Sequence, residues 1–208
     1  MRFRSWTLMT LIAALSVAAA ARAGFADGIA IGDAAPMADE AMKNVDGKDV
    51  TIAGLKGTKG TLVVFTCNHC PWAKAWETRI VELGNTYRKK GIGVIAINSN
   101  DPDAYPEDSF AEMQTRAKQR KIAYPYVVDA SSNVARAFGA SHTPEAFVFD
   151  ASGKLVYHGG IDDNAKEPNK VTQRWLRDAL SAVAAGKPVA MAETKAFGCG
   201  IKFRKEAS

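Results

Sequence analysis

Two cysteines separated by two residues, Cys67 and Cys70, are the part of the sequence best suited to chemistry. A β-branched and aromatic run, residues 61–66, leads into them, and an amphipathic segment that begins at Pro71 leads away, so the pair is expected where a strand becomes a helix. The first turn of a helix has unpaired backbone N–H groups and the positive end of the helix dipole, which stabilise a thiolate. We therefore expect the pKa of Cys67 to be lowered and Cys67 to be the nucleophile of a redox pair.

His69 lies directly before the second cysteine, where an imidazolium can approach the Cys67 sulfur and tune its thiolate. A solvent-facing histidine without a role is the alternative. The spacing of Cys67 and Cys70 is also that of zinc ligands, but a closed zinc site needs four protein ligands, and the sequence has no second Cys or His pair. We therefore predict a redox-active disulfide, Cys67–Cys70, and neither a metal nor another cofactor.

Strand and helix patterns alternate around the pair. Apolar residues at three- and four-residue spacing predict a helix from Pro71 to about Lys90 that ends at Gly91. The turn signal Asp46-Gly47-Lys48 predicts a hairpin ahead of the other elements. Further strands are predicted at 61–66, 92–97, 126–129, 146–149 and 155–157, and further helices at 110–121 (with 106–109 as its cap), 131–138 and 171–183. This order predicts one domain with a three-layer α/β fold.

Four stretches carry a family resemblance: residues 63–72, residues 96–100, Thr143-Pro144 with residues 147–150, and residues 198–202. Through them the chain resembles the redoxin branch of the thioredoxin-fold superfamily, the AhpC/TSA proteins and TlpA-like exported thioredoxins. It is most similar to peroxiredoxin-like thioredoxin proteins with a Cys-Asn-His-Cys-Pro motif, over roughly residues 31–205. The resemblance implies a thioredoxin-like α/β/α fold with a mixed central sheet and an N-terminal β-hairpin.

The resemblance also implies roles for residues outside the cysteine pair. Pro144 is expected to follow a cis peptide bond, to lie against the redox pair and, with Thr143 and Trp72, to contact the partner peptide. A trans proline at the edge of the strand is the alternative. His69 is similar to the histidine that oxidising relatives such as DsbA and protein disulfide isomerase place before their second cysteine. It therefore implies an oxidising pair, with a potential of roughly −180 to −120 mV.

The sequence departs from the family pattern in two places. Thr66 stands where thioredoxin has a tryptophan, and the uncharged run before it offers no buried aspartate, so no proton acceptor for Cys70 is identified. Val64 stands where peroxiredoxins have a threonine, three residues before the peroxidatic cysteine, which argues against peroxidase activity.

The expected activity is thiol-disulfide exchange with protein thiols or disulfides and with a redox donor or acceptor protein. One alternative is an antioxidant thiol peroxidase, in which a sulfenic acid at Cys67 condenses with Cys70 or Cys199. Another is a Cu(I)-binding protein, in which His142, directly before Thr143-Pro144, joins Cys67 and Cys70 in a set suited to Cu(I). The alternative for His142 is a loop residue without a role in the site. Cys199 could be a resolving thiol, an intermolecular bridge or a buried small hydrophobe, and the sequence does not choose among these.

Residues 1–23 have the pattern of a secretory signal peptide. Arg2 and Arg4 precede an apolar stretch, and small residues precede a cleavage position after Ala23. An uncleaved membrane anchor is the alternative. We expect a redoxin domain of residues 24–208 in the periplasm, where the environment keeps a cysteine pair joined or cycling.

The charge of the chain gives little support to nucleic-acid binding. The formal charge of +5 falls to +2 when the three arginines of residues 1–23 are removed, and no stripe of Lys and Arg with interleaved aromatics is present. No other segment is apolar and long enough to cross a bilayer. We therefore expect protein partners, no nucleic acid, and no membrane association after signal cleavage.

Overall fold

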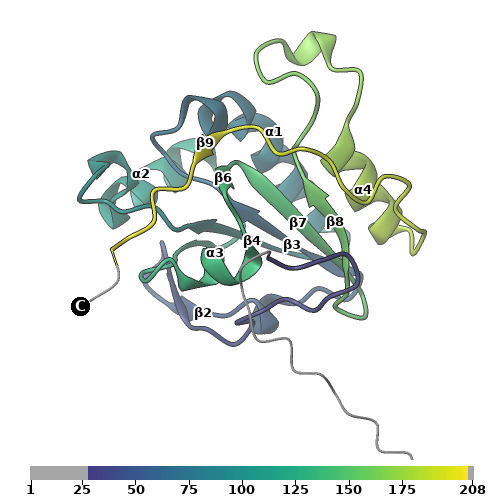
Figure 1. Cartoon of the computed structure of the whole chain (residues 1–208), viewed down its shortest axis with the longest axis horizontal. Helices are drawn as coiled ribbons and strands as arrows, with labels where there is room; N and C mark the ends of the chain where they lie inside the picture. Colours follow the sequence, from purple (N-terminus) through teal and green to yellow (C-terminus); the bar gives the residue numbers. More distant parts are fainter. Residues whose placement is uncertain (1–27, 206–208) are drawn as a thin grey trace, which may run out of the picture.

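Residues 28–205 are described by the computed structural model of this protein, and a mixed seven-stranded sheet lies at their centre (Figure 1). The order of strands across it is β2-β1-β5-β4-β3-β7-β8. The strands are β1 (Met42–Asn44), β2 (Asp49–Val50), β3 (Gly60–Phe65), β4 (Ile92–Asn98), β5 (Tyr126–Val128), β7 (Glu145–Asp150) and β8 (Leu155–Gly159), and a separate pair consists of β6 (His142–Thr143) and β9 (Cys199–Gly200).

Helices cover both faces of the sheet. One face carries α1 (Pro71–Arg88), α2 (Phe110–Arg120) and α4 (Trp175–Ala184), and the other carries α3 (Asn133–Phe138) (Figure 1). Short 3-10 turns lie at Ala53–Leu55, Pro106–Asp108 and Pro168–Lys170. This arrangement confirms the predicted thioredoxin-like three-layer α/β/α fold.

The central strand β3 is buried on both faces, because helices cover both sides of the sheet. Alternate residues enter the two cores: Leu62 and Val64 on the side of α1, Val63 and Phe65 on the side of α3. β3 pairs in parallel with β4 and antiparallel with β7, so the sheet is mixed. Burial on both sides explains why the sequence of β3 is continuously apolar rather than alternating.

The helix α1 begins directly after the cysteine pair, with Pro71 at its first position. Its buried face carries Trp76, Ile80, Leu83 and Tyr87 against the sheet, as the predicted apolar spacing requires. A hydrogen bond of 2.7 Å from Trp76 Nε1 to Asp162 Oδ1 ties the first turns of α1 to the loop that follows β8. The helix therefore starts at a fixed position relative to the sheet.

The remaining elements follow the sequence predictions closely. The hairpin around residues 46–48 forms as β1 and β2, and β1 also pairs with β5, which joins the hairpin to the central sheet. The last helix is shorter than predicted: it begins at Trp175 rather than at Val171. Thr172 instead lies in an irregular segment before the helix, where its backbone N–H donates to Asp163 Oδ1.

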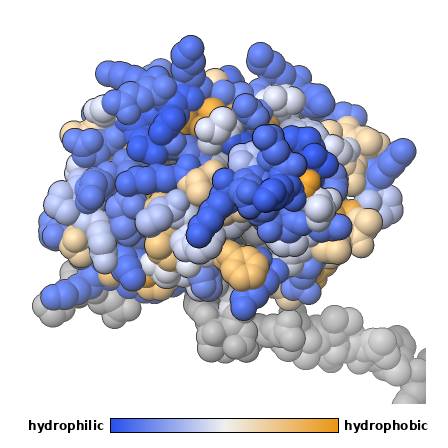
Figure 2. Space-filling model, turned by 90° about the horizontal axis from the view of Figure 1, so that it is seen from above, coloured by the Kyte–Doolittle hydropathy of each residue, from blue (hydrophilic) through white to orange (hydrophobic). Residues whose placement is uncertain are grey.

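The predicted signal peptide, residues 1–23, lies outside the described residues. Between residues 28 and 205, no helix combines the length and the apolar character that a bilayer span demands. Polar side chains predominate on the face seen in Figure 2, where apolar side chains are scattered and not gathered into one patch. Scattered apolar side chains of this kind are ordinary for a protein surface.

Candidate active site

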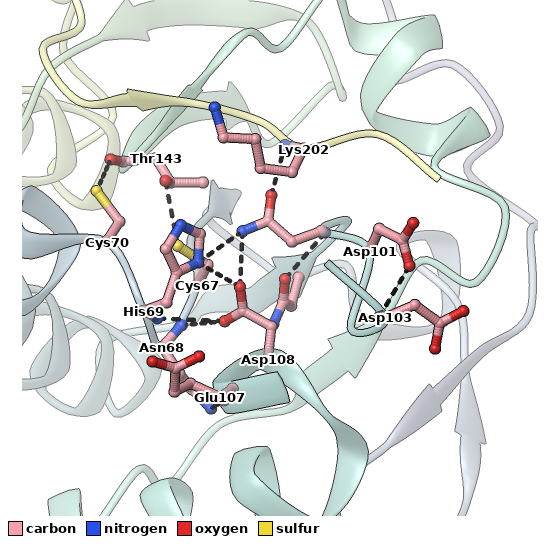
Figure 3. Close-up of polar contacts among 12 residues, drawn as sticks. Cys67, Asn68, His69, Cys70, Asp101, Asp103, Glu107, Asp108, Thr143 and Lys202 are labelled. Atoms are coloured by element: carbon pink, nitrogen blue, oxygen red, sulfur yellow. Dashed lines mark hydrogen bonds and ion pairs between the residues drawn. The ribbon is translucent and has the colours of Figure 1, made fainter. Parts of the chain in front are cut away.

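The two cysteines of the motif meet at the peptide before Pro144. Both are free thiols, and their side chains are buried, with Cys67 6% and Cys70 0% exposed. The Cys67 thiol donates to Thr143 Oγ1 at 3.2 Å, and the Cys70 thiol donates to the Thr143 carbonyl oxygen at 3.2 Å (Figure 3). The Thr143–Pro144 bond is cis, as the resemblance implies. Residues more than 70 positions apart are thus assembled into one site.

A buried carboxylate holds the loop that carries the cis peptide. Glu145 Oε2 accepts the backbone N–H groups of Ser141 and His142 at 2.8 and 2.9 Å, and Glu145 Oε1 lies 2.6 Å from His158 Nε2. Burial alone would raise the pKa of Glu145, but these hydrogen bonds outweigh it and hold the pKa below its ordinary value. The local pattern of the sequence does not reveal this network, since His158 lies on a different strand.

The expectation of a lowered pKa at Cys67 is wrong. The interaction with the Cys70 thiol, burial, and the nearby Asp108 carboxylate together raise the pKa of Cys67. The interaction with Cys67 lowers the pKa of Cys70 to about 4. The helix α1 begins at Pro71, as predicted, but its N-cap is Cys70, so the positive end of the helix dipole is nearest to Cys70 rather than to Cys67. The two sulfurs titrate as a pair, whose first proton leaves readily and whose second is retained.

Asp108 is a residue of the site that the sequence pattern does not reveal. Its fully buried carboxylate accepts the backbone N–H of Asn68 at 2.6 Å and that of His69 at 3.3 Å through Oδ1. Through Oδ2 it accepts His69 Nδ1 at 2.5 Å and Asn100 Nδ2 at 2.9 Å (Figure 3). Asp108 therefore fixes both the backbone between the cysteines and the ring of His69.

From its sequence, the stretch 106–109 is expected to cap the following helix. In the structure Ser109 is the N-cap of α2, but no side chain there caps the helix. Asp108 turns away from α2 toward the cysteine loop, about 40 residues earlier in the chain. An aspartate that caps a helix and one that binds a distant loop have the same local sequence pattern, so the sequence could not distinguish these two roles of Asp108.

His69 is held against the cysteine pair. Its side chain is 11% exposed, so the solvent-facing alternative does not describe it. Its ring stacks on Tyr105 with a centroid separation of 4.0 Å, and Nδ1 is bonded to Asp108. Ligand-type atoms of Cys67, His69 and Asp108 lie within 4.8 Å of one another. The expected proximity of His69 to Cys67 is therefore present, together with a carboxylate that was not expected.

These three residues are the group within residues 28–205 whose geometry could hold a metal ion. Their arrangement is that of a hydrogen-bonded network, because the Asp108 carboxylate already accepts four donors. A tetrahedral metal site would also need a fourth protein ligand or an open position. A metal would have to displace the hydrogen bond between His69 and Asp108.

The Cu(I) set of Cys67, Cys70 and His142, considered as an alternative, is not assembled. His142 Nδ1 lies 2.7 Å from Ser141 Oγ, and His142 does not belong to the convergent group described above. Adjacent residues of a strand point to opposite sides, so when the Thr143 side chain faces the Cys67 sulfur, the His142 side chain faces away from it.

Trp72 and Cys199 lie next to the cysteine pair. Trp72, in the first turn of α1, is 40% exposed and stacks on Trp76 with a centroid separation of 5.9 Å. Cys199 is half-buried and packs against Cys67, Cys70 and Ala73. The sequence could not place Cys199, because nothing in it showed where the C-terminal segment runs.

Comparison with known proteins agrees with this geometry. Residues 31–158 match the sequence profile of the AhpC/TSA family. The thiol-disulfide oxidoreductase ResA of Halalkalibacterium halodurans is 23% identical over 171 residues, which cover 80% of this chain and 93% of ResA.

Solved structures are also similar to the chain, and two of them illustrate this. An uncharacterised conserved protein from Geobacillus kaustophilus is 38% identical, with 86% of this chain and 94% of that chain covered and a TM-score of 0.78. A thiol:disulfide interchange protein of the thioredoxin family from Chlorobium tepidum is 26% identical, with 62% and 86% covered and a TM-score of 0.51. Because the family profile spans more than half of the chain, this protein belongs to the AhpC/TSA family of thioredoxin-fold redoxins and is an oxidoreductase.

Proposed function

We propose that this protein is an exported thiol-disulfide oxidoreductase that exchanges disulfides with partner proteins through Cys67 and Cys70. The observation that carries the proposal is the meeting of both sulfurs at the cis Thr143–Pro144 peptide, at the junction of β3 and α1. Two cysteines at this spacing can close a disulfide with each other, and the neighbouring backbone can orient a partner.

The exchange follows from the properties of the pair. After the pair loses its first proton, the remaining proton can move from Cys67 to Cys70, which leaves a thiolate on the more exposed sulfur. The Cys67 thiolate attacks one sulfur of a partner disulfide, a mixed disulfide forms, and the other partner sulfur leaves as a thiolate. Cys70 then attacks the Cys67 sulfur and releases the second partner thiol. The partner is reduced and the Cys67–Cys70 disulfide is formed; the reverse sequence oxidises a partner dithiol.

Neighbouring residues have proposed roles in orientation. His69, positioned by Asp108, tunes the charge next to Cys67. Thr143 and Pro144 position the reacting sulfurs and, with the exposed ring of Trp72, contact the partner protein. The redox donor or acceptor is another protein of the same compartment.

Export is proposed from the N-terminal pattern alone. Arg2 and Arg4, the apolar stretch after them and the small residues before Ala23 support a signal peptide of residues 1–23 and a mature redoxin domain of residues 24–208. A periplasmic location would keep the cysteine pair in exchange with other disulfides.

Insulin reduction with dithiothreitol as the electron donor tests the proposed activity. We expect turnover by the wild-type protein, background turnover by Cys67→Ser, and covalent mixed disulfides with insulin in Cys70→Ser that disappear on reduction. Turnover of Cys67→Ser equal to that of the wild type would contradict the proposal. Hydrogen peroxide consumption by the same preparations, without insulin turnover, would instead favour the thiol peroxidase alternative.

A further inference from the structure

The C-terminal segment returns to the redox site and adds a third sulfur to it. Strand β9 pairs antiparallel with β6, so that Cys199 lies opposite Thr143 and Gly200 lies opposite His142 (Figure 1). Thr143 is the residue whose hydroxyl and carbonyl groups contact the sulfurs of Cys67 and Cys70. The pairing therefore places Cys199 one strand away from the contact point of the pair.

Cys199 contacts the pair through Cys70. Its side chain packs against Cys67, Cys70 and Ala73, and its thiol interacts with the Cys70 thiol and with the backbone N–H of Trp72. The Cys70 sulfur in turn interacts with both Cys67 and Cys199. Cys70 is therefore the sulfur from which a disulfide can extend in either direction.

The backbone before Cys199 is in close contact with β6. A Cβ atom on Gly198 would lie 2.1 Å from the Thr143 carbonyl oxygen, which is closer than any real contact. At Gly200 the nearest atom, the Ser141 carbonyl oxygen, would be 3.8 Å away, an ordinary contact distance. Gly198 thus permits the close approach of β9 to the site.

Anchors on both sides hold Cys199 in this place. Ahead of it, the Thr194 N–H donates to the His158 carbonyl oxygen at 3.0 Å; after it, the Ile201 N–H donates to the Ser141 carbonyl oxygen at 2.9 Å. The sulfur of Cys199 therefore remains near Cys70 without any rearrangement of the segment.

Resting on the thiol-disulfide exchange proposed above, we propose that Cys199 is a third redox-active residue that accepts the disulfide from the oxidised pair at Cys70. The Cys199 thiolate attacks Cys70 Sγ, the Cys70–Cys199 bond forms, the Cys67–Cys70 bond breaks, and Cys67 leaves as a thiolate. The proton lost by Cys199 is taken up by solvent or by Cys67. The step moves a disulfide within the chain, so it needs no oxidant or reductant. Cys67 is then free to attack a partner while Cys70, which would release that partner, is occupied.

Oxidation of the pair changes the charge next to Cys199 in the direction that favours this step. In the reduced protein, burial and the negative Cys70 sulfur raise the pKa of Cys199 to about 11, against the opposing effects of Lys202 and the Trp72 N–H. A disulfide between Cys67 and Cys70 removes the negative charge of Cys70. Cys199 then ionises more readily, when its target disulfide is present.

Disulfide mapping in two matched variants tests the inference. Cys67→Ser and Cys70→Ser are each oxidised with one equivalent of diamide, quenched in acid, alkylated and digested with trypsin. In Cys67→Ser we expect an intramolecular disulfide that joins peptide 60–74 to peptide 196–202 and leaves no free thiol. In Cys70→Ser we expect at least about tenfold less of the linked peptide, because the sulfur with which the Cys199 thiol interacts is that of Cys70. In the wild type, the linked peptide should carry one alkylated cysteine at position 67.

The opposite result is equally distinct. Free thiols or intermolecular dimers alone in oxidised Cys67→Ser, or equal linkage in the two variants, would overturn the role of Cys199. Insulin turnover by the wild type is measured on the same preparation. Normal turnover without the linked peptide rejects the role of Cys199 and leaves the proposed function intact, whereas absent turnover rejects the proposed function itself.

Discussion

The carboxylate of Asp108 changes what the histidine beside the cysteines can do. Considered alone, His69 would favour the Cys67 thiolate and an oxidising pair. The structure places a buried carboxylate 2.5 Å from the His69 ring, and the same carboxylate raises the pKa of Cys67. A destabilised thiolate stabilises the disulfide relative to the reduced form. We therefore expect the Asp108 carboxylate to make the potential of the pair more negative than it would be without this charge.

Replacement of Asp108 by asparagine tests this charge effect. In a Cys70→Ser background, where Cys67 titrates without its partner thiol, Asp108→Asn removes the negative charge but keeps an oxygen that can accept the backbone N–H groups. We expect the pKa of Cys67 to fall and its alkylation by iodoacetamide at pH 7 to accelerate, on the order of tenfold for a shift of one unit. The measurement is the alkylation rate as a function of pH.

Asp103→Asn is the matched control for this experiment. Asp103 lies five residues earlier, is exposed, and belongs to the same loop without contacting the cysteine pair. It should leave the alkylation profile unchanged. An Asp108→Asn profile that coincides with that of the control would show that the carboxylate does not act on Cys67.

Residue positions could be predicted where the relevant information is local. The spacing of Cys67 and Cys70 singled out the cysteine pair, and the resemblance at Thr143-Pro144 implied the cis peptide; the structure brings the two together. Asp108 could not be identified, because its partners lie about 40 residues away and its own neighbourhood has the pattern of a helix cap. The Cu(I) alternative for His142 could not be decided from the sequence for another reason, since the alternation of side chains along β6 depends on which face of that strand meets the sulfurs.

At the level of elements, those with a local sequence pattern were predicted, and the short pair β6 and β9 was not. The apolar face of α1 and the continuously apolar β3 each span several turns or residues, so their types and approximate bounds follow from periodicity. Strand β9 has two residues, and its conformation depends on pairing with β6 rather than on its own composition. The position of β9 beside the cysteine pair depends on tertiary contacts, which no local sequence pattern contains.

Two glycines of the C-terminal segment allow the position of β9 to be tested. Gly198→Ala introduces a Cβ atom 2.1 Å from the Thr143 carbonyl oxygen, so β9 must move away from β6. We expect a loss of about 1–3 kcal/mol in the free energy of unfolding. In the Cys67→Ser background we also expect a lower yield of the Cys70–Cys199 disulfide, because the displaced strand carries Cys199 with it. Urea denaturation and the peptide map measure the two effects.

Gly200→Ala provides the comparison for this experiment. It adds the same methyl group two residues later in the same strand, where the nearest atom is 3.8 Å away. It should therefore keep both stability and disulfide yield near the values of the parent protein. Equal behaviour of the two variants would contradict the close approach of β9 to the cis peptide.

For the whole molecule, the site and the stability of the fold share a buried ionic network. Glu145 follows the cis proline and opens β7, while His158 belongs to β8, so their contact ties the loop at the redox pair to the edge of the sheet. The His158 ring also stacks on Phe147 with a centroid separation of 4.3 Å. Protonation of Glu145 at low pH should weaken this network. It should therefore loosen the loop of Thr143 and Pro144 as well as lower the free energy of unfolding.

Glu145→Gln isolates the ionic part of that network. The pKa of Glu145 is lower in the folded protein than in the unfolded chain, so its ionised form stabilises the fold above the unfolded-state pKa. This contribution is lost as the pH falls through the lower, folded-state pKa. At pH 7 we expect the variant to be less stable than the wild type by about 2 kcal/mol, the scale of charge-assisted hydrogen bonds. The difference should shrink as the pH is lowered from about 5 into the range below the folded-state pKa.

Urea denaturation from pH 3 to pH 7 measures this difference, with Glu167→Gln as the control. The carboxylate of Glu167 pairs with Lys170 at 2.8 Å, but both side chains are exposed. Because solvent screens such a pair, the control should change the free energy of unfolding by no more than about 0.5 kcal/mol at any pH. If the effect of Glu145→Gln stayed constant with pH, the loss would come from packing or geometry, and the buried charge would not be what holds the cis-proline loop against the redox pair.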